Sequence, residues 1–462
     1  MRALVPAALL FVVSCGVRMP FMAATTDDAF ITYRYVESIV GGAGFVYNPG
    51  ERVLGVTTPL YTLLLSLLAL LGLSPLSAGP WLNVIADSLV APILARRCAG
   101  AGAAPAATGW RFGPVLYALS PINAFWSASG METGLFCCAT ALALFYYERS
   151  KYNASAIACA VAFLLRVDAA ILIVVLLVHF AVARRRVPWK PLAVFLAAAG
   201  PWLVFATLYF GHPVPNSVLA KAALPKTGIA DAALYVLAMG FLHAGDALGI
   251  VMLLSAVYAV LFDERARWSA WTVYAIAYMA AYTLSLSQLH PWYYPPAYVG
   301  YAVAAGAGLD LACDRLRPGR WRRPVTAAMA VLLALNLVVT LREKLRDQVA
   351  LGTYLRSTGI AVREIAPAGS TLFLKDIGYL GYYSQLHIHD FAGLVTPGLT
   401  AFRAKEDFLG ALRQVRSDYA LLASDLAASL DRDPWFRTQY RVVCVFRGGA
   451  YRMVLYGRRD PL

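Results

Sequence analysis

The sequence predicts a polytopic α-helical membrane protein with a small α/β domain at its C-terminal end. Of the 462 residues, 60% are hydrophobic and only 14% are charged, and the mean hydropathy is +0.61. Soluble domains carry about 45–50% apolar and about 25% charged residues, so this composition excludes a soluble globular protein. Long apolar runs recur as far as Leu341, and charged residues become frequent beyond it.

Eleven apolar segments are candidates for membrane-spanning helices, each of which needs about 20 mostly apolar residues. They are residues 3–24, 76–95, 111–129, 131–148, 154–166, 168–183, 191–210, 246–262, 268–287, 293–313 and 324–341. The first of them shares features with a cleaved signal peptide, but a retained anchor suits a protein with many spans better. The apolar segment Pro59–Leu73 is too short to cross and suits an interfacial or re-entrant helix.

Basic residues gather in a few loops, and this distribution orients the chain in the membrane. The clusters are Arg96 and Arg97, Arg149 and Lys151, Arg184–Arg186 with Lys190, Arg265 and Arg267, and Arg315–Arg323. All of these clusters lie on the same side of the membrane only if Pro59–Leu73 does not span it. The positive-inside rule places that side in the cytoplasm, so the N-terminus lies inside and the C-terminus outside. The formal charge of +14 thus reports topology, and we expect no nucleic-acid partner.

Residues 342–462 are expected to form an extracytoplasmic soluble α/β domain after a membrane domain of residues 1–341. A helical pattern covers Lys405–Val415, and Gly448-Gly449 offers a hairpin turn. Four segments have the composition and spacing of strands, namely Ser370–Leu374, Tyr419–Ala423, Arg441–Phe446 and Tyr451–Tyr456.

The first outer loop opens with two adjacent carboxylates at the start of a predicted helix. Apolar residues at positions 30, 31, 33, 35, 36, 39 and 40 suit an amphipathic helix lying on the membrane surface. Asp27 and Asp28 stand where this helix begins, a place where aspartate is favoured as a cap and by the helix dipole. The pair therefore fits helix capping as well as catalysis.

Further polar residues lie at the outer ends of the predicted spans, where charged groups are costly and usually pair or serve function. They are Glu132, Arg166, Asp168, Asn216, Lys221, Lys226, His290 and Tyr293. As alternatives, Arg166 and Asp168 could simply neutralise each other, and His290 could belong to an interfacial aromatic belt with Trp292 and Tyr293.

Together these groups would surround an outer cavity beside the bilayer. Cations bind phosphate, and a carboxylate can deprotonate an attacking hydroxyl. An amphipathic helix on the membrane surface can guide a lipid tail. These are the parts needed to transfer a group from a lipid-linked phosphate donor to a hydroxyl acceptor outside the membrane.

Several strings of residues match the pattern of a known family. The first loop carries Asp27-Asp28-Ala-Phe-Ile-Thr-Tyr-Arg34-Tyr, then Gly44-Phe-Val-Tyr-Asn-Pro-Gly-Glu51-Arg and Thr57-Thr-Pro-Leu. Later strings are Gly130-Met-Glu132-Thr, Pro215-Asn216-Ser-Val-Leu-Ala-Lys221, Asp376-Ile-Gly-Tyr-Leu-Gly-Tyr-Tyr-Ser and Asp390-Phe-Ala-Gly-Leu-Val-Thr-Pro397. Over nearly its whole length the chain resembles the GT-C superfamily of integral-membrane glycosyltransferases. Within it, the chain is most similar to the mycobacterial terminal arabinofuranosyltransferase (AftB-like) type and its uncharacterised bacterial relatives.

The resemblance implies an inverting sugar transfer from a polyprenyl-phosphate-linked donor to a cell-envelope glycan or glycolipid. The active site would lie on the extracytoplasmic face of the bacterial cytoplasmic membrane. In this family an acid of the first loop is the general base, which corresponds to Asp28 or Asp27, with Asp28 preferred.

The other roles expected from the resemblance concern the donor and the acceptor. The donor phosphate would be bound by Arg34, Arg166 and Lys221, with His290 and Tyr293 as weaker candidates. The acceptor or the sugar would be bound by Glu132, Asn216, Tyr379, Tyr382 and Asp390. For Asp376 and Asp390, turn formation or capping is the alternative. Where relatives usually have Arg-Pro-Glu-Gly, this chain has Arg166-Val-Asp168-Ala, which keeps the charge pair but lacks the Pro and the Gly.

Other classes of function compete with this interpretation. A transporter or flippase of lipid-linked sugars would also place charges in spans, but such folds often contain internal repeats, and the sequence shows none. Among enzymes, a protein O-mannosyltransferase or a lipid A-modifying transferase is the nearer alternative. The seven cysteines have no zinc-ligand spacing. A divalent metal near the aspartate pair stays open, although the loop offers no dedicated set of ligands.

Overall fold

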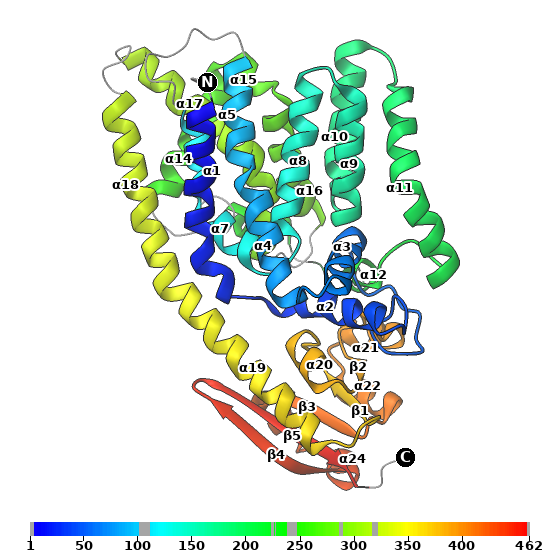
Figure 1. The fold of residues 1–462 in the computed structure, drawn as a ribbon. Helices are drawn as coiled ribbons and strands as arrows, with labels where there is room; N and C mark the ends of the chain where they lie inside the picture. The colour runs from blue at the N-terminus through cyan, green and yellow to red at the C-terminus, as the bar shows by residue number, and fades with distance from the viewer. Residues whose placement is uncertain are drawn as a thin grey trace. The chain divides into compact units, whose positions relative to one another are not determined.

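The computed structural model describes residues 4–100, 111–222, 226, 228–237, 247–285, 290–316 and 322–459 (Figure 1). The chain divides into two compact units, each assembled from three separate segments. The first unit comprises Met1–Ala24, Gly79–Trp202 and Lys226–Arg346, and the second comprises Thr25–Ala78, Leu203–Pro225 and Asp347–Leu462.

The first unit is helical throughout the residues that the structure describes. Its helices are α1 (Leu4–Arg18), η1 (Met19–Ala23), most of α4 (Pro75–Ser88), α5 (Val90–Gly100), α6 (Phe112–Ala118), α7 (Pro121–Ala128), α8 (Thr133–Glu148), α9 (Tyr152–Leu165), α10 (Ala169–Arg184), most of α11 (Trp189–Phe210), α13 (Ile229–Val236), α14 (Ala247–Phe262), α15 (Glu264–Arg267), α16 (Ala270–Ser285), η3 (Pro291–Tyr293), α17 (Tyr294–Leu316), α18 (Arg322–Thr340) and η4 (Leu341–Leu345). The described residues of every predicted span are therefore mostly helical.

One predicted span, residues 111–129, is broken into two helices. Pro121 cannot donate a backbone hydrogen bond back into α6, so α6 ends and α7 starts a new helix at this residue, capped by Ser120. A further bend of 119° separates α7 from α8. Gly130 lies in that bend with a φ of 86°, a left-handed conformation that favours glycine.

Three helical stretches in the described part of the chain are long and apolar enough to cross a membrane. They are Pro6–Ala23, Pro75–Cys98 and Trp189–Phe210, and the bent pair of α7 and α8 would add a fourth if it forms one span. Several other apolar helices are shorter, among them α9 and α10. The count of eleven spans stays a prediction.

Helix α17 packs at the centre of the first unit, against α6, α14 and α16. Glycines permit this close packing, because a Cβ at Gly300 would collide with the Trp271 carbonyl and one at Gly308 with the Ser255 carbonyl. Small residues at helix interfaces let backbones approach in this way.

The second unit combines helices from the first outer loop with the α/β tail. Its helices are α2 (Asp27–Val40), α3 (Pro59–Leu70), α12 (Asn216–Ala222), nearly all of α19 (Arg346–Ile365), α20 (Tyr379–Ser384), η5 (Pro397–Leu399), α21 (Thr400–Ala404), α22 (Phe408–Val415), α23 (Ser424–Leu430) and α24 (Pro434–Gln439). Its strands are β1 (Thr371–Leu374), β2 (His387–Asp390), β3 (Tyr419–Ala423), β4 (Tyr440–Gly448) and β5 (Tyr451–Arg458).

The five strands form one mixed sheet in the order β2-β1-β3-β5-β4 (Figure 1). Strands β1, β2 and β3 are parallel, whereas β5 is antiparallel to both β3 and β4. The four strands expected from the sequence are confirmed, as is the turn at Gly448-Gly449. Strand β2 was not predicted, because it is short and carries three polar residues. The helix expected at Lys405–Val415 is α22, which begins three residues later at Phe408.

Candidate active site

Helix α2 places the two adjacent aspartates in its first turn. Thr26 precedes the helix in an extended conformation, and Asp27 and Asp28 follow it. All residues from Ala29 to Val36 are buried, which fixes the helix within the second unit. The predicted helix is thus confirmed, but it is buried around its circumference in this stretch instead of presenting one apolar face. Carboxylates are stabilised in the first turn by the helix dipole.

Asp27 is held by backbone groups from the start of α20. Its Oδ2 accepts the N–H of Gly378 at 2.9 Å, and its Oδ1 accepts the N–H of Tyr379 at 2.8 Å. A Cβ on residue 378 would collide with the backbone carbonyl of Asp27, so glycine is required for this approach. Each carboxylate oxygen keeps a second lone pair, and the side chain is only partly buried.

The surroundings of Asp27 also raise the pKa of its carboxyl group. Burial, followed by the negative charge of Asp376, raises the pKa of Asp27 from 3.8 to about 7, and Asp28 adds to the same effect. The two backbone N–H groups oppose the shift without cancelling it. A carboxyl with a pKa near the operating pH is suited to accept a proton in catalysis.

Arg34 lies deeper along α2 and donates to four protein oxygens. Its Nε contacts the Tyr47 carbonyl at 3.0 Å, Nη1 the Gly381 carbonyl at 2.5 Å, and Nη2 the Leu386 carbonyl at 2.6 Å and Asn48 Oδ1 at 3.4 Å. The guanidinium also lies 4.2 Å from the centre of the Tyr47 ring. These contacts tie the tail to the first loop, and the predicted role of Arg34 in phosphate binding stays a prediction.

Tyr379 and Tyr382 pack against Phe30 of α2. Their ring centres lie 3.8 Å and 5.4 Å from that of Phe30. The Tyr379 hydroxyl lies 2.5 Å from the hydroxyl of Thr25. Both tyrosines are largely buried, so their contacts in the structure position α20.

Asp390 is completely buried at the end of β2. Its carboxylate accepts the N–H groups of Ala392, Leu394 and Val395 at 2.7, 2.6 and 3.2 Å. Burial raises the pKa of Asp390 to about 7. This geometry favours the turn-forming alternative over direct contact with an acceptor.

Helix α12 carries Asn216 and Lys221, two further predicted site residues, in the second unit. The backbone N–H of Asn216 donates to the carbonyl of Leu54 at 2.8 Å, which ties α12 to the first loop. Lys221 lies one helical turn further on and is half-buried. The neighbouring side chains of Val218 and Leu219 are exposed and apolar, as expected beside lipid.

The first unit contains a separate polar cluster around Arg166. The guanidinium makes a two-point contact with Asp168, at 3.1 and 2.8 Å, and lies 3.4 Å from Glu132. The hydroxyls of Tyr278 and Tyr282 donate to Asp168 Oδ2 at 2.6 and 2.7 Å. The ion pair between Arg166 and Asp168, one of the two sequence-based interpretations, is therefore present.

His290 and Tyr293 adjoin this cluster. The Arg166 guanidinium lies 5.1 Å from the centre of the Tyr293 ring. His290 stacks on Trp292 with ring centres 4.3 Å apart and planes at 1°. The structure thus brings Glu132, Arg166, His290 and Tyr293 together in one unit, and Asp27, Asp28, Arg34, Tyr379, Tyr382 and Asp390 in the other.

Sequence reasoning assigned no role to several residues that shape these clusters. Tyr278 and Tyr282 are four residues apart on α16, a spacing that puts both on one helix face. Tyr47 donates its hydroxyl to the Ile377 carbonyl at 2.5 Å, beside the Asp27 contacts. No local pattern in the sequence distinguishes Tyr47 from other loop tyrosines.

A second buried charge pair was also missed. Arg18 donates to Asp87 at 2.5 Å, and the Tyr117 hydroxyl donates to the same carboxylate at 2.6 Å. Both charged side chains are fully buried. The sequence offers one sign of this pair: Arg18 and Asp87 each stand within an apolar run, where charged groups are costly and usually paired.

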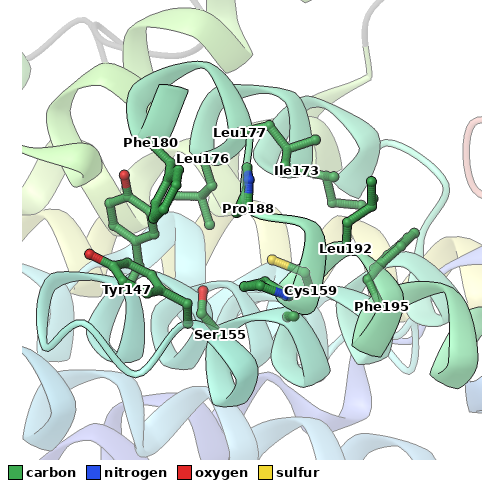
Figure 2. A pocket seen from close by; sticks show the side chains of 13 residues that line it. Tyr147, Ser155, Cys159, Ile173, Leu176, Leu177, Phe180, Pro188, Leu192 and Phe195 are labelled. Carbon is green, nitrogen blue, oxygen red and sulfur yellow. The ribbon is translucent and has the colours of Figure 1, made fainter. Parts of the chain in front are cut away.

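Two further features bear on cofactors and ligands. Among the described residues, no three His, Cys, Asp or Glu side chains are grouped so that they could hold a metal ion. An apolar pocket in the first unit lies between α8, α9, α10 and α11 (Figure 2). Its lining includes Tyr147, Ser155, Cys159 and Phe195 but no carboxylate, so it does not resemble a site of sugar transfer.

Comparisons with known proteins agree with the helical architecture. A family model described as a domain of unknown function (DUF8728) matches residues 342–456. A search of curated proteins gave no match.

Among solved structures, the chain is similar to apo ArnT from Cupriavidus metallidurans, with 15% identity, a TM-score of 0.61 and coverage of 98% of both chains. The undecaprenyl phosphate-bound ArnT from the same organism gives 16% identity, a TM-score of 0.57, and coverage of 98% of this chain and 97% of that one. The archaeal oligosaccharyltransferase AglB from Archaeoglobus fulgidus, in complex with an inhibitory peptide and a dolichol-phosphate, gives 13% identity, a TM-score of 0.60, and coverage of 98% and 74%. The chain therefore has the fold of ArnT and AglB over almost its whole length.

Proposed function

We propose that this protein transfers a sugar from a polyprenyl-phosphate-linked donor to a hydroxyl acceptor on the extracytoplasmic face of a bacterial cytoplasmic membrane. The similarity in fold, over almost the whole chain, to proteins solved with undecaprenyl phosphate or dolichol-phosphate carries this proposal. Residues 1–341 would form the membrane domain and residues 342–462 the extracytoplasmic domain. The acceptor would be a cell-envelope glycan or glycolipid, and the donor panel in the test below identifies the sugar.

Asp27 is the general base in this proposal, with Asp28 as its neighbour in the same turn. Its carboxylate takes the proton of the acceptor hydroxyl while the hydroxyl oxygen attacks the anomeric carbon of the sugar. The bond from that carbon to the phosphate oxygen breaks, and polyprenyl phosphate leaves with the electron pair. A single displacement of this kind inverts the anomeric carbon. The pKa of about 7 and the fixed position of Asp27 support its role as the base.

A cation near the leaving phosphate would stabilise its charge. Lys221 fits this role, because it lies among exposed apolar side chains in the unit that carries Asp27. Arg166, His290 and Tyr293 stay candidates for the same role, with Glu132 and Asn216 as candidates for the sugar or the acceptor. Arg34 would act by holding the tail against α2, since its donors already contact four protein oxygens.

The test is a transfer assay with the purified protein in lipid. A panel of radiolabelled polyprenyl-phosphate sugars is combined with cell-envelope glycan acceptors, and labelled product is separated from donor. We expect one donor to label an acceptor with the wild type and not with Asp27→Asn. Glu364→Gln, which removes an exposed carboxylate from α19 in the same unit, is the matched control and should stay active. Absence of transfer from every donor would contradict the proposal.

A further inference from the structure

The second unit contains a pocket at the end of its sheet. It holds about 470 Å³ of space, within the range of about 300–1,000 Å³ that is usual for small-molecule sites. Its charged lining residues are Lys375 and Asp376 after β1, Asp425 after β3, and Arg403 and Glu406 at and beyond the end of α21.

The sheet topology explains why a pocket lies here. After β1 the chain passes through α20 to β2 on one side, and after β3 it continues to β4 and β5 on the other side. β1 and β3 are adjacent parallel strands, so the connections leaving their carboxyl ends diverge. In open α/β sheets, ligands bind in the crevice at such a point.

The lining has the chemistry of a site for a neutral, hydroxyl-rich ligand. The three carboxylates can accept hydrogen bonds from hydroxyl groups, and the two cations can donate to hydroxyl or ring oxygens. An anionic ligand would face three carboxylates against two cations. The rest of the lining is largely apolar and includes Phe408. The ring centre of Phe408 lies 3.6 Å from that of Phe391, against which it stacks. The apolar lining can pack against the C–H face of a sugar.

The pocket is joined to the proposed base by one short turn. Asp376 lines the pocket, and Gly378 and Tyr379, which lie two and three residues further on, donate their N–H groups to Asp27. Leu380 at the start of α20 also lines the pocket. A ligand held here would therefore lie near the carboxylate that is proposed to take the acceptor proton.

We infer that this pocket binds a neutral sugar unit of the acceptor glycan, next to the unit whose hydroxyl reacts. The inference rests on the proposed function, because it gives the acceptor its binding site. It assigns Arg403, Asp425 and Asp376 to acceptor recognition; of these, the sequence had singled out only Asp376, for which turn formation or capping was the alternative.

The test measures glycan binding directly, without turnover. Neutral oligosaccharides of arabinose, mannose, galactose or glucose units are titrated into the full-length protein in lipid nanodiscs by calorimetry. The variants are Arg403→Gln and Asp425→Asn, from two different elements, with Arg437→Gln as the matched control on the exposed surface of α24.

We expect one oligosaccharide class to bind the wild type and Arg437→Gln equally, and to bind each pocket variant about 10-fold more weakly, the usual effect of losing one hydrogen bond to a charged group. Absence of binding by every oligosaccharide, or equal binding by the pocket variants, would overturn the inference. Tight binding of inorganic phosphate that displaces the sugar would do so as well. Failure of sugar transfer with intact, pocket-dependent glycan binding would instead contradict the proposed function alone.

Discussion

Replacing Asp27 by Asn removes the proposed base while keeping the shape of the side chain. The amide cannot take a proton, and loss of a positioned general base typically lowers the rate by about 10²–10⁴-fold. The amide also has one acceptor oxygen where the carboxylate has two. One of the N–H groups of Gly378 and Tyr379 then faces the amide NH2 group, and an unsatisfied donor costs about 1–3 kcal/mol.

The pH dependence separates these two effects. A base with a pKa raised to about 7 is protonated and inactive in acid, so wild-type kcat/KM should rise with pH and level off above about 7. The assay follows labelled product in lipid from about pH 5 to about pH 9, with thermal unfolding of each variant in parallel. Above about pH 7, Asp27→Asn should lose activity by about 10²-fold or more, and the variant should lack this limb. Glu364→Gln should keep both the activity and the limb. Full activity of Asp27→Asn, or a rate that is flat in acid for the wild type, would refute the reasoning.

Three further predictions follow from contacts within single units. Asp376→Asn should shift the acidic limb of kcat/KM to lower pH, because the charge of Asp376 raises the pKa of Asp27; an unchanged or upward-shifted limb would contradict this coupling. Gly378→Ala should lower the free energy of unfolding by about 1–3 kcal/mol, since the new Cβ collides with the Asp27 carbonyl. Gly398→Ala, where the nearest atom lies 3.6 Å from the new Cβ, should be near neutral in the same thermal unfolding experiment, and equal effects would count against the close approach. Asp168→Asn should destabilise the first unit by up to about 3–5 kcal/mol, because it removes the charge that pairs with Arg166 and one of the two oxygens that the guanidinium contacts; an unchanged unfolding temperature would argue against that ion pair.

The regular elements were predictable because each follows from a local pattern. Apolar runs gave the positions of the helices in the first unit, and composition and spacing gave four of the five strands. Strand β2 was missed because His387-Ile-His-Asp390 pairs only through its place beside β1 and has no apolar alternation of its own. Pro121 lies inside a predominantly apolar run. Hydropathy alone therefore predicts one continuous span where the structure has two helices, α6 and α7.

The candidate site was predictable in its residue types but not in its contacts. The adjacency of Arg166 and Asp168 made their pairing foreseeable. The contact of Asp27 with Gly378 spans 351 positions along the chain, and neither residue carries a local sign of the other. The contacts of Arg34 could not be predicted for the same reason. Its four acceptor oxygens lie in the first loop and in the segment from α20 to β2, and carbonyl oxygens have no sequence signature.

The central claim is that a sugar leaves a polyprenyl phosphate and joins a hydroxyl acceptor. The most direct measurement quantifies both products of one reaction, the glycosylated acceptor and free polyprenyl phosphate, by mass spectrometry. The account predicts equal amounts of the two with the wild type, and neither with Asp27→Asn. Release of polyprenyl phosphate without glycosylated acceptor, or neither product with any donor of the panel, would contradict it.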